Sequence, residues 1–151
     1  MVESLSVAVI LSNGIVAGVF FAVLVSVLPT LFAMPLGQYV ETHRLLGKGY
    51  HPAMPVIVNV GTVGAVLLAF LAPSAATKAL FGAAAVLLVG VQAVSHLLNV
   101  PINRKVHAVD LDRLPAGWRD PRPAWRNWHQ LRTALAFAAF LANSTAVVLA
   151  A

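Results

Sequence analysis

The 151-residue sequence contains no cysteine and few charged residues. Without cysteine the chain cannot form disulfides, thiolate metal sites, iron–sulfur clusters or a cysteine nucleophile. Only 10% of the residues are charged, whereas 60% are hydrophobic, and the mean hydropathy is +0.85. One water-soluble core of this size could not bury that much apolar surface. The composition therefore indicates an integral membrane protein.

Four long stretches lack Asp, Glu, Lys and Arg altogether, namely residues 4–40, 49–77, 79–103 and 133–151. A helix needs roughly 20 apolar residues to cross the hydrocarbon core of a membrane, so each stretch can hold one span. A transmembrane barrel is excluded because its strands alternate apolar and polar residues, whereas these stretches are apolar on all sides. The fold class that we predict is all-α.

The predicted architecture is a four-helix integral membrane bundle that forms a single transmembrane domain over residues 1–151, with spans at about 5–31, 53–71, 79–100 and 130–150. Pro101 is expected to end or kink the third span. A long polar loop, residues 101–124, then leads to the fourth span. Within the first span, Gly14 and Gly18 have the small-xxx-small spacing that is typical of packed membrane helices.

The basic residues are distributed unequally between the two sides of the predicted membrane. Nine of the ten lie in or beside the loops 34–52 and 101–124, and only Lys78 lies in the turn on the other side. The positive-inside rule then makes these two loops cytoplasmic and both termini extracytoplasmic, in a bacterial inner membrane. This rule explains the net charge of +5 better than a nucleic-acid partner, and we expect no nucleic acid to bind.

A polar stripe runs along the third span. Its members are spaced i, i+3, i+4, i+7 and i+11, and they are Gln92, Ser95, His96, Asn99 and Asn103. Lipid cannot satisfy these groups, so the stripe should face the interior of the bundle. There it could form either a functional site or hydrogen bonds between helices.

A second polar face marks the start of the fourth span. Trp125, His129 and Arg132 are spaced i, i+4 and i+7, so an indole, an imidazole and a guanidinium share one side of the helix. Arg132 could extend toward the membrane surface, or it could hold an anionic group such as an enolate or a phenolate.

All five histidines fall at the cytoplasmic ends of the predicted helices: His43, His51, His96, His107 and His129. They could simply occupy the membrane interface. Alternatively, His43, His51, His96 and His129 converge on a metal site in the bundle. Imidazole ligands suit copper or iron, and a thioether from Met54 would favour copper.

Two elements of the sequence resemble a known family. One is Leu98-Asn99-Val100-Pro101-Ile102-Asn103, and the other is Trp125-Arg-Asn-Trp128-His129-Gln-Leu-Arg132-Thr133. Together they resemble the anthrone oxygenase-like family of small four-helix membrane proteins, several of which are associated with aromatic polyketide pathways. Residues 17–21 and 28–31 are similar to that family's first helix.

This resemblance implies oxygenation of an activated aromatic carbon, anthrone to anthraquinone, with molecular oxygen and without flavin, haem or nicotinamide. It assigns the site to Asn99, Asn103, Trp128, His129 and Arg132. In this scheme His129 is the general base, an asparagine orients the substrate oxygen and Arg132 stabilises its negative charge. If His129 instead binds a metal, it cannot also be the free base.

The function that we predict is therefore that of a membrane-embedded oxygenase acting on an aromatic, phenolic or anthrone-like natural-product intermediate. Its expected partners are the lipid bilayer, a small aromatic substrate and molecular oxygen. The sequence does not decide whether the protein forms a homo-oligomer. The alternative is a non-catalytic membrane scaffold or assembly subunit, in which the polar stripe joins helices.

The predicted topology can be tested because the chain has no native cysteine. Single cysteines introduced at Ser4 and Ala116 should react with a membrane-impermeant maleimide from opposite sides of the membrane, Ser4→Cys from the outside. Reaction of both from the same side would show that the topology is wrong.

Overall fold

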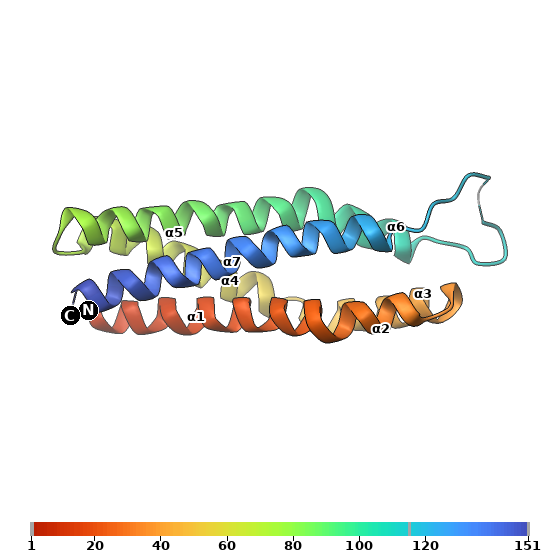
Figure 1. Cartoon of the computed structure of the whole chain (residues 1–151), viewed down its shortest axis with the longest axis horizontal. Coiled ribbons are helices and arrows are strands. Elements are labelled where there is room, and N and C mark those ends of the chain that lie inside the picture. Colours follow the sequence, from red (N-terminus) through yellow and green to blue (C-terminus); the bar gives the residue numbers. More distant parts are fainter. Residues whose placement is uncertain (1, 115, 151) are drawn as a thin grey trace.

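The computed structural model describes residues 2–114 and 116–150, which form helices joined by turns and one long loop, with no strand among them (Figure 1). Four of the helical rods are long and apolar enough to cross a membrane. The predicted all-α membrane bundle is thus confirmed.

The first rod consists of α1 (Val2–Ala22), the π-helical segment η1 (Val23–Val27) and α2 (Leu28–Ala33). The second rod is α4 (Ala53–Leu71). The third consists of α5 (Ala75–Val94), the π-helical segment η2 (Ser95–Asn99) and α6 (Val100–His107), and the fourth is α7 (Arg122–Ala150). A shorter helix, α3 (Leu36–Tyr50), connects the first rod to the second.

Pro101 is expected to end or kink the third span, and the first of these alternatives is wrong because the helix continues through Pro101 to His107. A proline ring inside an α-helix clashes with the carbonyl four residues earlier, which here belongs to Leu97. Leu97 lies in η2, where the wider π turn relieves that clash. The first rod repeats this arrangement, with η1 just before Pro29. The polar loop is therefore shorter than predicted and covers residues 108–121.

The rods form one bundle in which α5 packs on α7 and α4, and α1 packs on α4 and α7. The turn between α4 and α5 is short because Ser74 and Thr77 form a reciprocal capping box at the start of α5. The core of this half of the bundle is made of small and aliphatic residues, including Val9, Ala65, Leu68, Ala84, Leu88, Ala139 and Ala146. It contains no ionisable group among the described residues.

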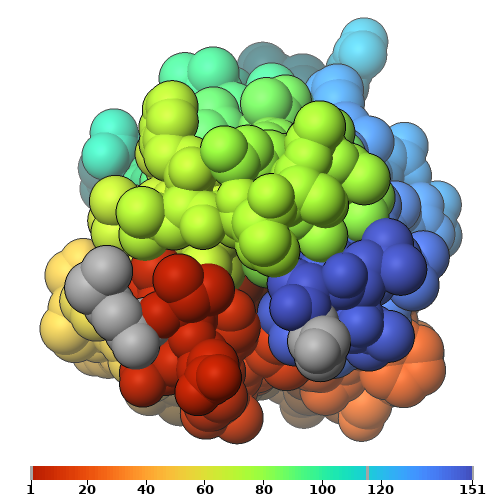
Figure 2. Space-filling model, turned by 90° about the vertical axis from the view of Figure 1, so that its left-hand side faces the viewer, coloured from red at the N-terminus to blue at the C-terminus, as the bar shows by residue number. Residues whose placement is uncertain are grey.

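The start of α1 and the end of α7 lie side by side at one end of the bundle, next to the α4–α5 turn (Figures 1 and 2). The opposite end carries α3, α6 and the loop 108–121, and we call it the loop end. Four spans with both termini at one end agree with the predicted helix count. The side of the membrane that each end faces stays a prediction.

Two arginines hold the loop end together by donating to backbone carbonyls at and just beyond the C-terminal ends of two helices. Arg44 of α3 donates from Nη2 to the carbonyls of His107 and Val109, at 3.0 and 2.8 Å. Arg122 of α7 donates from Nη1 to the carbonyls of Leu31 and Met34, at 3.0 and 2.8 Å. These bonds attach α3 to α6 and the start of α7 to the end of α2.

At two glycines of α4 the helix packs closely against α1. A Cβ on Gly61 would lie 2.8 Å from Oδ1 of Asn13, and a Cβ on Gly64 would overlap Cγ2 of Val9. The spacing of Gly14 and Gly18 suggested a similar contact, but Gly18 has no atom within 4 Å of its Cβ position. The small-residue pattern therefore lies on α4.

Replacing Gly64 by alanine should destabilise the bundle by about 1–3 kcal/mol, the usual result of overfilling a packed interior. Thermal unfolding in detergent would show a lower midpoint for Gly64→Ala. The matched control is Gly18→Ala, whose new methyl group meets open space and should leave the midpoint unchanged or raise it slightly, since alanine favours a helix more than glycine does. Equal midpoints for the two variants would contradict the close packing of α1 on α4.

Candidate functional site

Two adjoining cavities lie at the loop end, between the first rod, α3, α4, the third rod and α7. The first cavity has a volume of about 170 Å³ and the second of about 190 Å³. Both are lined by Phe20, Gly47, Tyr50, Met54 and Arg132. His43, Asn103 and Trp125 line only the first cavity, whereas His51, Gln92, Ser95 and His96 line only the second.

Arg132 stands where the two cavities meet. Its Nε donates to Nδ1 of His129 at 2.9 Å, and its Nη1 donates to Oγ of Ser95 at 3.4 Å. The guanidinium carbon lies 4.5 Å from the ring centroid of Phe20 and 5.4 Å from that of Trp125. In the part of the chain that the structure describes, the one ion pair joins Arg122 to Asp120. Arg132 therefore has no carboxylate to neutralise it.

His129 is fully buried and both of its ring nitrogens are engaged. Nε2 lies 2.9 Å from the carbonyl oxygen of Phe20, and a carbonyl can only accept, so Nε2 carries the hydrogen. Nδ1 then has a lone pair, which accepts the hydrogen bond from Arg132. The neutral imidazole thus links α1 to the guanidinium. The ring of Trp125 stacks on it at 5.0 Å.

The two π-helical segments both flank this site. Phe20 lies three residues before η1, where the wider turn shifts backbone carbonyls away from their usual α-helical donors. Ser95, the first residue of η2, donates to the Val91 carbonyl at 2.7 Å and accepts from Arg132. The prolines that require these wide turns therefore also shape the site.

Asn99 and Asn103 hold Trp125 in place. Oδ1 of Asn103 accepts from the indole nitrogen of Trp125 at 2.7 Å, and Nδ2 of Asn99 donates to its backbone carbonyl at 3.2 Å. Oδ1 of Asn99 is buried without a partner. Trp128, which the family resemblance placed in the site, is 37% exposed and lines neither cavity.

The polar stripe of the third rod divides into two roles. Gln92 donates to the hydroxyl of Thr62 at 3.0 Å, and this hydroxyl donates to the Val58 carbonyl. This part of the stripe joins α5 to α4, as the interhelical alternative predicted. Ser95 and His96 line the second cavity, and the side chain of Gln92 also borders it.

The histidines do not gather into the predicted metal site. His51 and His96 line the second cavity, His43 lines the first, and His129 uses both nitrogens within the protein. Among the described residues, no group of three or more His, Asp or Glu side chains could hold a metal ion. The donor set therefore does not fit a resident copper or iron ion.

His43 is a buried residue of α3, 7% exposed, whose Nδ1 has no hydrogen-bond partner. Burial and the neighbouring His107 lower the pKa of His43 to about 4, so its imidazole is neutral at neutral pH. Burial and the charge of Asp120 raise the pKa of the adjacent Tyr39 to about 12, which keeps its hydroxyl protonated.

Sequence reasoning missed several residues of this site. The sequence places Trp125 on the polar face with His129 and Arg132, but the family resemblance did not assign it to the site. Phe20 and Tyr50 carry no sequence signal that separates them from other aromatic residues in apolar helices.

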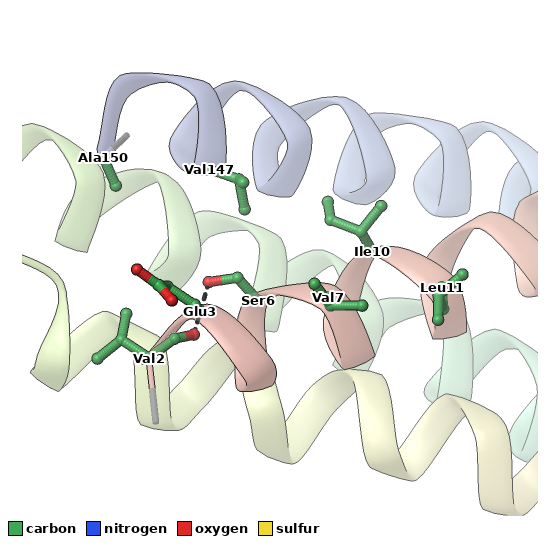
Figure 3. Close-up of a pocket in the computed structure, with 8 residues that line it drawn as sticks. All are labelled: Val2, Glu3, Ser6, Val7, Ile10, Leu11, Val147 and Ala150. Atoms are coloured by element: carbon green, nitrogen blue, oxygen red, sulfur yellow. Dashed lines mark hydrogen bonds between the residues drawn. The ribbon is translucent and has the colours of Figure 1, made fainter.

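A third hollow lies at the other end of the bundle, between the start of α1 and the end of α7 (Figure 3). It has a volume of about 570 Å³ and is wide open. Its polar side chains are Glu3 and Ser6, and the Ser6 hydroxyl donates a hydrogen bond to the carbonyl of Val2 at 2.9 Å. Without converging polar groups it offers no chemistry comparable to that of the loop end.

Comparison with known proteins gives one match. A family model described as anthrone oxygenase matches residues 42–142 of the 151. The matched region extends from α3 into α7 and includes His43, η2, both site asparagines, Trp125, His129 and Arg132. No curated protein and no solved structure matches the chain.

The lowered pKa of His43 predicts acid sensitivity. Between about pH 4 and pH 6.5 the unfolded chain binds a proton at this residue and the folded chain does not. The contribution of neutral His43 to the free energy of unfolding is therefore complete above pH 6.5 and decreases as the pH falls toward 4. Unfolding midpoints measured in detergent should decrease as the pH falls from 6.5 to 4. In His43→Gln this pH dependence should be flatter over the same range. An unchanged slope in the variant would contradict the burial of a neutral imidazole.

Proposed function

The chain belongs to the anthrone oxygenase family, and from this premise we propose that it uses molecular oxygen to convert an acidic carbon of an aromatic intermediate into a carbonyl. Membership of the family indicates oxygenase-type activity on polyketide intermediates. The proposal adds the chemical class of the substrate: an anthrone-like or phenolic compound that reacts as its anion.

The observation that carries this proposal is the Arg132 guanidinium between the two cavities. A buried charge inside a membrane protein is costly unless it is paired. Hydrogen bonds to His129 and Ser95 and the faces of two aromatic rings stabilise the cation but do not neutralise it. An anionic ligand oxygen would supply the missing charge, and guanidinium groups bind oxyanions well.

The remaining lining of the cavities fits a flat aromatic ligand. Phe20 and Tyr50 line both cavities, and Trp125 closes the first. Met54 lies on both cavities and adds a polarizable, adaptable surface. Because the two cavities share these walls, a fused-ring compound could extend from one into the other with its oxygen at Arg132.

The reaction balances with oxygen as the sole oxidant. A C–H bond of the substrate's CH₂ group breaks, the proton leaves, and the electron pair is delocalised onto the ring oxygen that faces Arg132. One electron passes to O₂, and the resulting superoxide and carbon radical combine to form a C–O bond. The peroxide takes up a proton, and loss of the second C–H proton with cleavage of the O–O bond gives a carbonyl and water.

His129 has a positioning role in this proposal. Its Nε2 is fixed by the Phe20 carbonyl and its Nδ1 holds Nε of Arg132, so neither nitrogen is free to take a substrate proton. These bonds support orientation of the guanidinium by His129 over the general-base role expected from the resemblance. Asn103 acts through Trp125, whose indole it holds at 2.7 Å.

Arg132→Lys should lower oxygen uptake with anthrone by about 10²-fold, the usual effect of removing one donor that stabilises a developing oxyanion. Lysine keeps the charge but loses the planar fork that His129 and Ser95 orient. Uptake would be measured with purified protein in nanodiscs. The matched control is Arg126→Lys, an exposed arginine of the same helix, which should retain wild-type uptake.

Full uptake by Arg132→Lys would show that Arg132 does not bind the oxyanion. A wild-type protein that consumes no oxygen with anthrone or with simple phenols would contradict the proposed activity. That result would favour the non-catalytic scaffold, in which hydrogen bonds such as that of Gln92 with Thr62 serve only to join helices.

A further inference from the structure

The first cavity is lined by one imidazole that makes no hydrogen bond among the contacts described so far. His43 lines the first cavity together with Arg132 and Trp125, and its Nδ1 is buried without a hydrogen-bond partner. Its ring lies edge-on to Trp125 at 6.2 Å between centroids. This differs from His129, where protein groups occupy both nitrogens.

His43 is also in contact with a histidine that reaches the surface. The ring centroids of His43 and His107 are 5.6 Å apart, with an interplanar angle of 80°. His107 is exposed at the end of α6, and its ring lies 3.7 Å from the position of a Cβ on Gly47, a residue that lines both cavities. The two imidazoles therefore connect the first cavity with the water at the loop end.

The other titratable groups near His43 are tyrosines and arginines. Tyr39 contacts its ring at 5.6 Å and is protonated at neutral pH, as its raised pKa of about 12 requires. Arg122 lines a small neighbouring cavity with His43, and Arg132 and Tyr50 lie on the first cavity. Arginine remains protonated, so His107 is the neighbour that can exchange a proton with His43.

We propose that His43 accepts the proton from the substrate carbon and passes it to His107, which releases it to water. In the first step the C–H bond breaks, its electron pair stays with the substrate, and the proton bonds to a ring nitrogen of His43. In the second step the proton moves to His107, directly or through one water molecule. This inference rests on the proposed function and adds its proton acceptor and exit route.

The surroundings of His43 favour passing a proton on over keeping it. Its neutral form is available to accept a proton, while burial disfavours the imidazolium that results. The proton therefore moves on to the exposed His107, where water solvates the charge. The Arg44 bond to the His107 carbonyl, at 3.0 Å, holds the end of α6 against α3 and keeps the two rings together.

Proton abstraction can be measured separately from oxygen chemistry. Under anaerobic conditions in D₂O, wild-type protein should accelerate exchange of the CH₂ protons of anthrone, followed by NMR. His43→Gln should slow this protein-dependent exchange by about 10²-fold or more, together with aerobic oxygen uptake. The matched control is Glu41→Gln, an exposed position on the same helix, which should behave as the wild type.

Binding separates a chemical role of His43 from a structural one. Affinity for the phenolate of a hydroxyanthraquinone, a product-like anion, should be retained in His43→Gln and lost in Arg132→Gln. Exchange at the wild-type rate in His43→Gln, or loss of phenolate binding there, would overturn the assignment of His43 as proton acceptor. If wild-type protein catalyses neither exchange nor oxygen uptake, the proposed function itself fails.

The second step predicts chemical rescue. His107→Gln should lower oxygen uptake, and imidazole added to the buffer should restore it because the position is exposed. The buried His43→Gln variant should not respond to imidazole. Full uptake by His107→Gln without imidazole would overturn the exit route.

Discussion

The loop end is organised around one electrostatic constraint, a guanidinium held between membrane-spanning helices without a carboxylate. Arg132 donates to His129, which requires the Nδ1 lone pair and therefore a hydrogen on Nε2. That hydrogen needs an acceptor, and the Phe20 carbonyl of α1 provides it next to a π-helical turn. The conformation of the first rod is thus coupled to the charge on the fourth. An anion that entered the cavities would meet a cation whose orientation is already fixed, so little reorganisation would accompany binding.

The same end of the bundle depends on two further arginines, which donate hydrogen bonds to backbone carbonyls. Arg44 and Arg122 cap the carbonyls at the ends of α6 and α2, and each comes from a different helix. The hydrogen bonds and charge of Arg122 also keep the pKa of Asp120 below its usual value, although burial acts to raise it. These bonds place α3 over the cavities. Together with the hydrophobic cluster of Leu31, Tyr39, Val40 and Val106, they fix the position of His43 relative to Trp125.

Much of this arrangement could be predicted from the sequence, because membrane helices leave strong signals. Charge-free stretches gave the four helices, and the i, i+4, i+7 spacing placed Trp125, His129 and Arg132 on one face. The π-helical segments could not be predicted, since proline indicates a break or a kink as readily as a wide turn. The structure gives no support to the predicted metal site, and the reason is geometric. Position along a helix gives the depth of a histidine in the bundle but not the direction in which its ring points.

Chemistry and packing are separated along the length of the bundle. The half that contains both termini is closely packed through Gly61, Gly64 and many alanines, and its core cluster contains no ionisable side chain among the described residues. The loop end contains two smaller cavities, the Arg132 guanidinium between them, π-helical turns and the unpartnered nitrogen of His43. Each of these features weakens local packing or hydrogen bonding, and such features are tolerated only where surrounding structure holds them in place. The same helices run through both halves, so the closely packed half can hold the less stable half in register.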